Sequence, residues 1–380
     1  MKSSRDPGSR AVPAATTAGV AAMSAVVEQL PAAEQPKREI PKQLAELFEK
    51  IPTQDEATIK EVFTKLVQGG PATVERLVAL VGDEFGDPQG VKPKYALHGL
   101  VHYASRPGAD AERKMIAETL AKELSAKHSD ELKAFICRQL QLCGRPQEVP
   151  ALAPLLASDR LCEPATQALL AIGGQQATAA LRAALLKAKG KRVATIIKAL
   201  GRLQDKDSAD AIRKAVDDPD RNVRLVAWYA LGNMGDAHSM GLLLTAADTD
   251  APFERIQATD ACLLLGRRLA EAGKTQDAEK IFRQLLDERK APEDVYDRCA
   301  ALEGLAAAIG GKAVDDVMAA MGSDDVKYRV PAARTAVDLA RSIRTDDPRQ
   351  AEKLLKKVLE ATKEETVRQQ AQLLLGKPPT

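Results

Sequence analysis

Polar and apolar residues alternate with the period of an amphipathic helix from residue 41 onward. In the segment 55–67, Ile59, Val62, Phe63 and Leu66 recur at spacings of three and four residues, which places them on one helix face. The same pattern predicts further helices over 43–51, 72–85, 94–105, 109–126 and 130–143, and it continues to the end of the chain. Because no segment alternates with the period of a strand, we expect an all-α fold.

The second half of the chain repeats one helical pattern, in which an arginine is followed three residues later by an alanine. The copies begin at Arg224, Arg255, Arg298, Arg329 and Arg368. Arg224 and Arg255 are 31 residues apart, and so are Arg298 and Arg329. Ala230 has equivalents 31 and 62 residues earlier, at Ala199 and Ala168. Recurrence at intervals of roughly 20 to 50 residues is typical of stacked repeats, so the sequence predicts a solenoid.

The clearest copy runs from Asp220 to Asp236 and contains Arg224-Leu-Val-Ala-Trp-Tyr-Ala-Leu-Gly. It resembles the HEAT-like repeat first noted in phycobilin lyases, and the resemblance extends over residues 146–377. This resemblance implies antiparallel helix pairs stacked into a right-handed α-solenoid, a HEAT-like superhelix with a concave face. Such repeats serve many unrelated tasks, so the resemblance indicates the fold and not the function.

Two features depart from this repeat pattern. The unit near 252–310 is longer than the others, and its segment 275–286 resembles a tetratricopeptide helix. Pro331 lies inside the fourth copy of the pattern. Since proline has no backbone N–H to donate, we expect it to interrupt and kink its helix.

The chain divides into three predicted parts: a disordered Ala- and Pro-rich tail or weak targeting segment over 1–38, an N-terminal helical module over 39–145, and the repeat array over 146–377. Basic residues precede an acid-free stretch at 11–27, as in a signal peptide, but this stretch contains no Leu, Ile or Phe. We therefore expect a cytoplasmic protein, or an exported one if 1–27 is a signal peptide. No apolar run is long enough to predict a membrane span.

The repeated arginines follow turns that contain acids or start a helix, such as Asp218 and Asp220 before Arg224. A guanidinium group can form forked hydrogen bonds to carboxylates in the turn of the next repeat. We therefore predict that these arginines form a structural ladder, with contact to a ligand as the alternative: Arg224, Arg255, Arg298, Arg329 and Arg368.

The charge balance and the cysteine spacing argue against a protein that mainly binds nucleic acid and against a zinc site. The chain has 55 basic and 53 acidic residues, a formal net charge of +2, whereas proteins that mainly bind nucleic acid usually have a strongly basic surface. Its five cysteines match no zinc-binding spacing and are expected to be small buried side chains in a reducing compartment. The sequence predicts no cofactor and no metal.

One helix of the N-terminal module carries Tyr95, His98 and His102. The two histidines are four residues apart and share a helix face, a geometry that can hold a metal. Nearby acids could supply oxygen ligands: Asp83, Glu84 and Asp87. No His-Glu pair or catalytic motif accompanies them, so we interpret them as ordinary helix residues or a patch that contacts a partner. An enzyme or lyase-like chaperone using this face is the alternative.

A basic stretch over 182–206 contains Asp205 as its one acid. It predicts either a solvated turn and helix face or a surface for an acidic partner, formed by Lys187, Lys189, Lys191 and Arg192. Weak binding of nucleic acid is the further alternative. The acid-rich repeat that follows partly neutralises the field of this stretch.

Trp228 and Tyr229 are adjacent in the clearest repeat and therefore point about 100° apart on their helix. At least one of them is expected near the surface or at a boundary between repeats. The pair therefore either packs against a neighbouring repeat or contributes to a groove for a partner, since aromatic residues are favoured binding anchors. Together these features predict a monomeric, non-enzymatic scaffold that binds a protein or peptide partner on the concave face of the solenoid.

Overall fold

The computed structural model describes residues 39–83 and 86–376. Within these residues the regular structure is α-helix and short 3-10 turns, and no strand is present. All of the helices belong to one compact unit that begins at Lys42. The predicted tail over 1–38, including the possible signal segment 1–27, lies outside the described residues.

The helices begin and end close to the predicted positions. In the N-terminal half they are α1 (Lys42–Phe48), α2 (Glu56–Gln68), α3 (Gly70–Val81), α4 (Val91–Ala104), α5 (Asp110–Leu124), α6 (Asp130–Cys143), α7 (Val149–Leu152), α8 (Cys162–Ile172), α9 (Gly174–Leu185) and α10 (Lys191–Arg202). In the C-terminal half they are α11 (Ala209–Arg213), α12 (Arg221–Met234), α13 (Met240–Ala247), α14 (Pro252–Glu271), α15 (Thr275–Glu288), α16 (Val295–Ile309), α17 (Val314–Met321), α18 (Val326–Ile343), α19 (Pro348–Ala361) and α20 (Glu365–Leu374).

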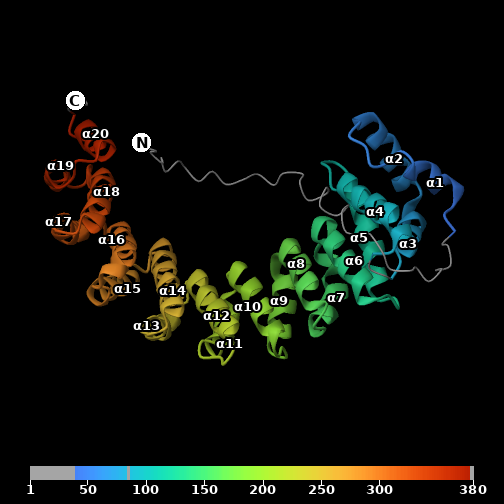
Figure 1. Ribbon diagram of the computed structural model, residues 1–380, viewed down its shortest axis with the longest axis horizontal. Helices are drawn as coiled ribbons and strands as arrows, with labels where there is room; N and C mark the ends of the chain where they lie inside the picture. Colours follow the sequence, from blue (N-terminus) through green and yellow to red (C-terminus); the bar gives the residue numbers. More distant parts are fainter. Residues whose placement is uncertain (1–38, 84–85, 377–380) are drawn as a thin grey trace, which may run out of the picture. The chain divides into compact units, whose positions relative to one another are not determined.

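The even-numbered helices form one continuous layer. From α2 to α20 each packs against the next even-numbered helix, and from α4 onward each also packs against the odd-numbered helix that precedes it. Within this unit the even-numbered helices of the repeat array line the inner side of a curved row, and odd-numbered helices such as α11, α13 and α17 lie on its outer side (Figure 1). The predicted all-α solenoid of helix pairs is confirmed.

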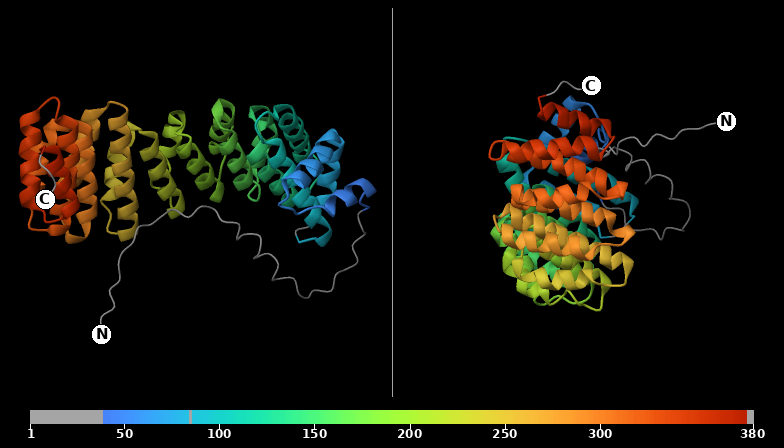
Figure 2. Two further views of the ribbon diagram at one scale, coloured as in Figure 1. Left: turned by 90° about the horizontal axis from the view of Figure 1, so that it is seen from above. Right: turned by 90° about the vertical axis from the view of Figure 1, so that its left-hand side faces the viewer.

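The helices follow one another along the row without a lateral jump (Figure 2). α6 and α8 pack together across residue 145, where the predicted N-terminal module meets the repeat array. The module's own even-numbered helices, α2, α4 and α6, belong to the same layer. No helix within the described residues is long and apolar enough to cross a membrane.

Small residues allow successive even-numbered helices to approach closely. A Cβ atom added to Gly201 would lie 2.7 Å from the Cβ of Ala230, and one added to Gly232 would lie 2.6 Å from the carbonyl oxygen of Ala261. Such separations are far below ordinary van der Waals contact. The Ala-Leu-Gly sequence that recurs in this part of the chain is therefore required by the distance between α10, α12 and α14.

In the longer unit near 252–310, one large side chain is buried between three helices. α14 is 20 residues long, and α15, the segment that resembles a tetratricopeptide helix, buries Phe282 completely. A Cβ added at Gly266 of α14 or at Gly304 of α16 would come within 2.6 Å and 2.4 Å of the Phe282 ring, respectively. The two glycines thus make room for one phenylalanine between three helices.

Pro331 does not interrupt its helix, so the expected interruption was wrong: α18 runs continuously from Val326 to Ile343. The proline ring removes the N–H that would bond the carbonyl of Lys327, one turn earlier. The thiol of Cys299 on α16 donates a hydrogen bond to this carbonyl oxygen at 3.7 Å. The neighbouring repeat therefore partly satisfies the acceptor that the proline leaves free.

Candidate interaction face

The even-numbered helices present one repeated line of side chains on the inner side of the row. Tyr229 of α12 lies five residues after Arg224, and the corresponding residues of the neighbouring helices follow from the repeat spacing. These residues are Gln167 on α8, Lys198 on α10, Asp260 on α14, Glu303 on α16 and Arg334 on α18. All but the half-buried Gln167 are exposed. We call the surface along this line, from α8 to α18, the inner face.

Large apolar side chains are exposed on three successive helices of the inner face. Tyr229 is 44% exposed, Phe253 49%, Ile256 53% and Tyr296 75%. Phe253 and Ile256 lie near the start of α14, and Tyr296 lies at the start of α16. Three of the four exposed aromatic residues in the described part of the chain are in this set, although aromatic residues make up only 3% of the sequence. We call these four residues the apolar row.

Trp228 is not part of this surface. It is only 3% exposed, and its indole N–H donates a hydrogen bond to the carbonyl oxygen of Val216 at 3.0 Å. The prediction that this pair of aromatic residues contributes to a partner groove is therefore wrong for Trp228, which belongs to the core. Tyr229, about 100° further around the helix, faces solvent.

Three cations follow one side of α10: Lys191, Lys198 and Arg202. All three are exposed, and none has an ion pair with another described residue. Lys198 and Arg202 line a shallow groove of about 170 Å³ between α8, α10 and α12, together with Glu163 and Val226. We call these three residues the basic strip.

The other predicted basic residues are placed differently. Lys187 and Lys189 are exposed in the turn between α9 and α10. Arg192 instead points back into the fold, where its guanidinium contacts the carboxylate of Asp159 at 2.9 Å and donates to the carbonyl oxygen of Ala157 at 2.7 Å. Arg192 thus joins α10 to the turn before α8 and is less available to a partner than Lys191.

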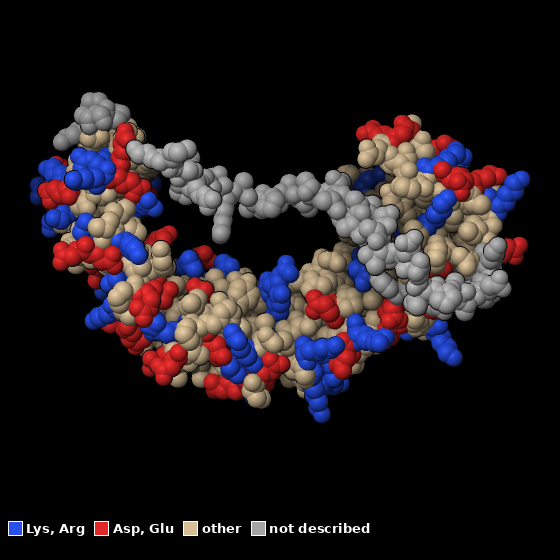
Figure 3. Space-filling model, viewed as in Figure 1, with Lys and Arg blue, Asp and Glu red and all other residues tan. Residues whose placement is uncertain are grey.

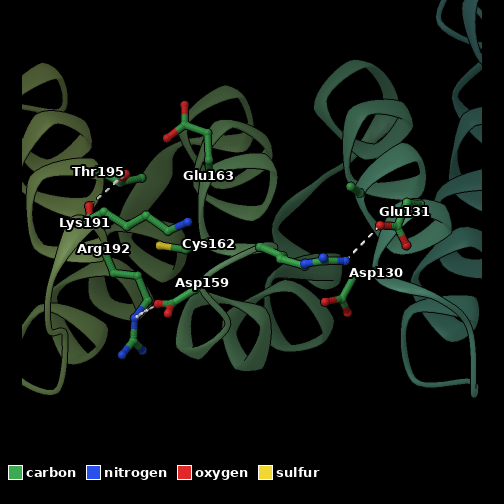
Figure 4. Close-up of a pocket in the computed structure, with 10 residues that line it drawn as sticks. Asp130, Glu131, Asp159, Cys162, Glu163, Lys191, Arg192 and Thr195 are labelled. Carbon is green, nitrogen blue, oxygen red and sulfur yellow. Dashed lines mark hydrogen bonds and ion pairs between the residues drawn. The ribbon is translucent and has the colours of Figure 1, made fainter. Parts of the chain in front are cut away.

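A second hollow, of about 470 Å³, lies where α6, α8 and α10 begin (Figure 4). The figure shows Lys191 extending across it while Arg192 turns toward Asp159. Cys162 lies at its base but is buried, and burial raises the pKa of its thiol. A protonated thiol is a poor nucleophile, so Cys162 is not an activated cysteine. The rest of the lining is mostly polar, as in an ordinary surface groove.

The repeated arginines contact the next repeat, the turn that precedes their own helix, or both. Arg224 donates to both carboxylate oxygens of Glu254 at 2.9 Å and to the carbonyl oxygen of Asp218 at 2.7 Å. The remaining arginines reach the following acceptors: Arg255 the carboxylate of Asp294 at 2.8 Å, Arg298 that of Asp325 at 3.4 Å, Arg329 the carbonyl of Ala361 at 3.2 Å, and Arg368 the carbonyl of Thr362 at 3.2 Å. These contacts are the kind that a structural ladder makes.

His98 and His102 are exposed on α4, with their ring centroids 4.5 Å apart in an edge-to-face arrangement. The Nδ1 atom of His98 lies 3.0 Å from the Oε1 atom of Gln139. Partial burial, and the charge of His98 to a smaller degree, lower the pKa of His102. Tyr95 is exposed one turn earlier on the same helix.

The acids near this histidine pair are used elsewhere or not described. The carboxylate of Asp83 accepts a hydrogen bond from the backbone N–H of Ser129, and that of Asp87 accepts one from the N–H of Gln89. Glu84 lies outside the described residues. No cluster of three potential metal ligands exists among the residues that the structure describes. The geometry therefore gives no support to a metal site at this face.

Comparison with known proteins identifies the repeat type. A family model for HEAT repeats matches residues 191–263, which contain α10 to α13 and most of α14. This segment is built of HEAT repeats. The basic strip and three residues of the apolar row lie within these HEAT repeats, and the match does not specify the phycobilin-lyase subtype. No curated protein matches the chain significantly in sequence.

Solved structures also resemble this chain in fold. A crystal structure of a mutant form of Kap121p aligns over 91% of this chain and 44% of its own, with 10% identity and a TM-score of 0.50. A crystal structure of importin beta aligns over 88% of this chain and 50% of its own, with 13% identity and a TM-score of 0.47. The chain thus spans half or less of these proteins' lengths. The similarity to the Kap121p structure is one of fold.

Proposed function

We propose that this HEAT-repeat protein is a non-enzymatic scaffold that binds a protein or peptide partner along its inner face. The observation that supports this most is the apolar row, in which Tyr229, Phe253, Ile256 and Tyr296 are exposed on the neighbouring even-numbered helices α12, α14 and α16. Removing apolar surface from water contributes about 25 cal/mol per Å², so a partner that covers this row gains free energy. Aromatic residues are also common anchors of protein interfaces.

Two of the three helices that display this row are joined by close contacts. α12 and α14 pack at the close distance set by Gly232 and Ala261, and the Arg224–Glu254 contact joins the same two helices. A rigid surface loses little conformational freedom on binding, which leaves more of the contact energy for affinity.

Neither alternative function gains comparable support. An enzyme or lyase-like chaperone at His98 and His102 would need further reactive groups, and His98 is engaged by an amide of Gln139. Nucleic-acid binding would use the basic strip, but Asp260 and Glu303 occupy the equivalent inner positions on α14 and α16. Charge of both signs around an apolar centre is the usual composition of a protein interface.

The test is affinity capture from the native cells with three purified baits, followed by mass spectrometry. The baits are the wild type, the inner-face variant Tyr229→Ala/Tyr296→Ala, and the control variant Leu186→Ala/Leu242→Ala, which removes two exposed leucines elsewhere. We expect one or more partners to be captured by the wild type and the control and lost from the inner-face variant.

Equal capture by all three baits would contradict the proposal. Loss of capture in His98→Ala/His102→Ala, with the inner-face variant unaffected, would instead favour the N-terminal face. The mass of each bait in solution, measured by light scattering, tests the expected monomer and shows whether the apolar row pairs two copies of the chain.

A further inference from the structure

We propose that the groove between α8, α10 and α12 binds an acidic peptide segment whose carboxylates are followed by an apolar side chain. This inference depends on the proposed function, because it names the class of partner that the inner face accepts. Its basis is the order of chemical groups along the face: uncompensated cations on α10, then exposed apolar residues on α12 and α14.

The cations of the basic strip lie on one side of one helix. Lys191, Lys198 and Arg202 are separated by seven and four residues, spacings that bring side chains to the same face of a helix. Two other basic residues of this region are neutralised within the fold. Arg182 contacts the carboxylate of Asp205 at 2.9 Å, and Arg192 contacts that of Asp159 at 2.9 Å.

Lys198 and Arg202 have no ion pair with a described residue, and Glu163 is the one acid that lines their groove, so the charged side chains of the groove give it a net positive potential. A ligand that supplies carboxylates gains from this potential without displacing an existing ion pair, so no internal contact is lost on binding.

The groove itself fits a narrow chain. Its basic groups are Lys198 and Arg202, and its one acid is Glu163, whose carboxylate accepts a hydrogen bond from the Nε2 of Gln167 at 2.8 Å. The rest of the lining is polar Gln167 and Thr195 and apolar Leu170, Ala194, Ala199 and Val226. This lining of apolar and cationic side chains suits a peptide segment that carries acidic side chains.

The charge sequence across the helices favours a peptide over a nucleic acid. At equivalent inner positions the residues are Lys198 on α10, Tyr229 on α12, Asp260 on α14 and Glu303 on α16. A continuous polyanion that ran past α12 would meet these carboxylates and be repelled. A peptide can place acids over α10 and an apolar side chain against Tyr229, which matches both parts of the face. Figure 3 shows basic and acidic side chains interspersed over the visible surface, without one extended basic face.

The experiment is selection from a displayed library of random peptides in which acidic, basic and apolar residues occur equally. The baits are the wild-type chain, Lys198→Glu/Arg202→Glu, and the control Lys214→Glu/Lys312→Glu. The control makes the same change in charge at exposed lysines of α11's C-terminal end and of the turn before α17.

We expect peptides selected by the wild type and the control to be enriched in Asp and Glu beside a large apolar residue. The best of these, synthesised and labelled, should bind at least about tenfold more weakly to Lys198→Glu/Arg202→Glu than to the control, because two attractive contacts become repulsive. Its affinity for the wild type should also fall as salt is raised from 50 to 200 mM, values chosen to span the usual range of screening.

Selected peptides without acidic enrichment, or equal weakening in the groove and control variants, would overturn the proposal. Tighter binding of a single-stranded DNA 20-mer, a length chosen as a probe, than of the selected peptide, with the same loss in the groove variant, would assign the strip to nucleic acid instead. Failure of this inference is distinguishable from failure of the scaffold function. If native capture still depends on Tyr229 and Tyr296, the scaffold stands and only the acidic preference is lost.

Discussion

Replacing Arg224 by methionine tests whether the repeated arginines stabilise the stack. In the native protein the guanidinium of Arg224 binds both carboxylate oxygens of Glu254 at 2.9 Å and the carbonyl oxygen of Asp218 at 2.7 Å. Both charged side chains are mostly buried between α12 and α14. Methionine retains much of the length of the side chain while it removes the charge and every donor.

The expected cost follows from these contacts. Hydrogen bonds to charged groups contribute about 1.5–3 kcal/mol each, whereas exposed ion pairs contribute about 0.2–1 kcal/mol. After the substitution, Glu254 retains only Arg221, whose Nε lies 3.8 Å away. We therefore expect Arg224→Met to lower the free energy of unfolding by about 2–3 kcal/mol, a value between the exposed and fully buried limits.

The assay is urea unfolding followed by fluorescence of Trp228, the one tryptophan of the chain, which lies four residues from Arg224 on α12. Because solenoids can unfold repeat by repeat, this local signal reports the repeat that is perturbed. A double-mutant cycle with Glu254→Gln should give a coupling energy of about 1–2 kcal/mol. As a control, Arg341→Met removes an exposed pair with Asp338 and should cost less than about 0.5 kcal/mol.

A cost below about 0.5 kcal/mol for Arg224→Met, or a coupling energy near zero, would refute the structural interpretation of the ladder. In that case Arg224 would be free to serve a ligand, which is the alternative that the sequence leaves open. Loss of partner capture by a fully stable Arg224→Met protein would point in the same direction.

Three further predictions test the packing and the core. Gly232→Ala should destabilise the protein by about 1–3 kcal/mol because its Cβ would lie 2.6 Å from the carbonyl oxygen of Ala261, whereas Gly241→Ala on α13, which has open space, should be neutral or stabilising in thermal unfolding. Trp228 should emit at short wavelength in the native state and shift to longer wavelength on unfolding; native emission typical of exposed indole would contradict its burial. Burial raises the pKa of Cys262 to about 12, so its thiol stays neutral in the native state while the unfolded thiol ionises near the ordinary value of 9.0. The contribution of Cys262 to stability is therefore full well below pH 9 and falls by up to about 1.4 kcal/mol per pH unit as pH rises toward 12; Cys262→Ala should reduce the pH dependence of stability by this amount in urea titrations at several pH values.

The sequence by itself determined the fold class and the repeat. Helical periodicity and the 31-residue spacing are local properties of the chain, because side chains three and four residues apart share a helix face in any helix. The Ala-Leu-Gly positions were visible for the same reason. Their purpose, close approach of Gly201 to Ala230 and of Gly232 to Ala261, became measurable only when neighbouring helices were placed.

Tertiary structure decided which side chains remain free. From sequence, Trp228 and Tyr229 were equivalent candidates, and the packing of α12 buried one and exposed the other. Likewise Lys191 and Arg192 are adjacent, but only Arg192 meets an acid, because the turn before α8 brings Asp159 next to it. Burial and ion pairing depend on residues that are distant in the chain, so no local pattern can assign them.

The apolar row also could not be predicted from local sequence patterns. Tyr229, Phe253 and Tyr296 are isolated aromatic residues in the sequence, at intervals of 24 and 43 residues. They gather on one surface because each even-numbered helix packs against the next with little lateral offset. The sequence determined that these helices form and stack. Packing across the layer decided which side of each helix is exposed, and so brought these aromatic residues to one surface.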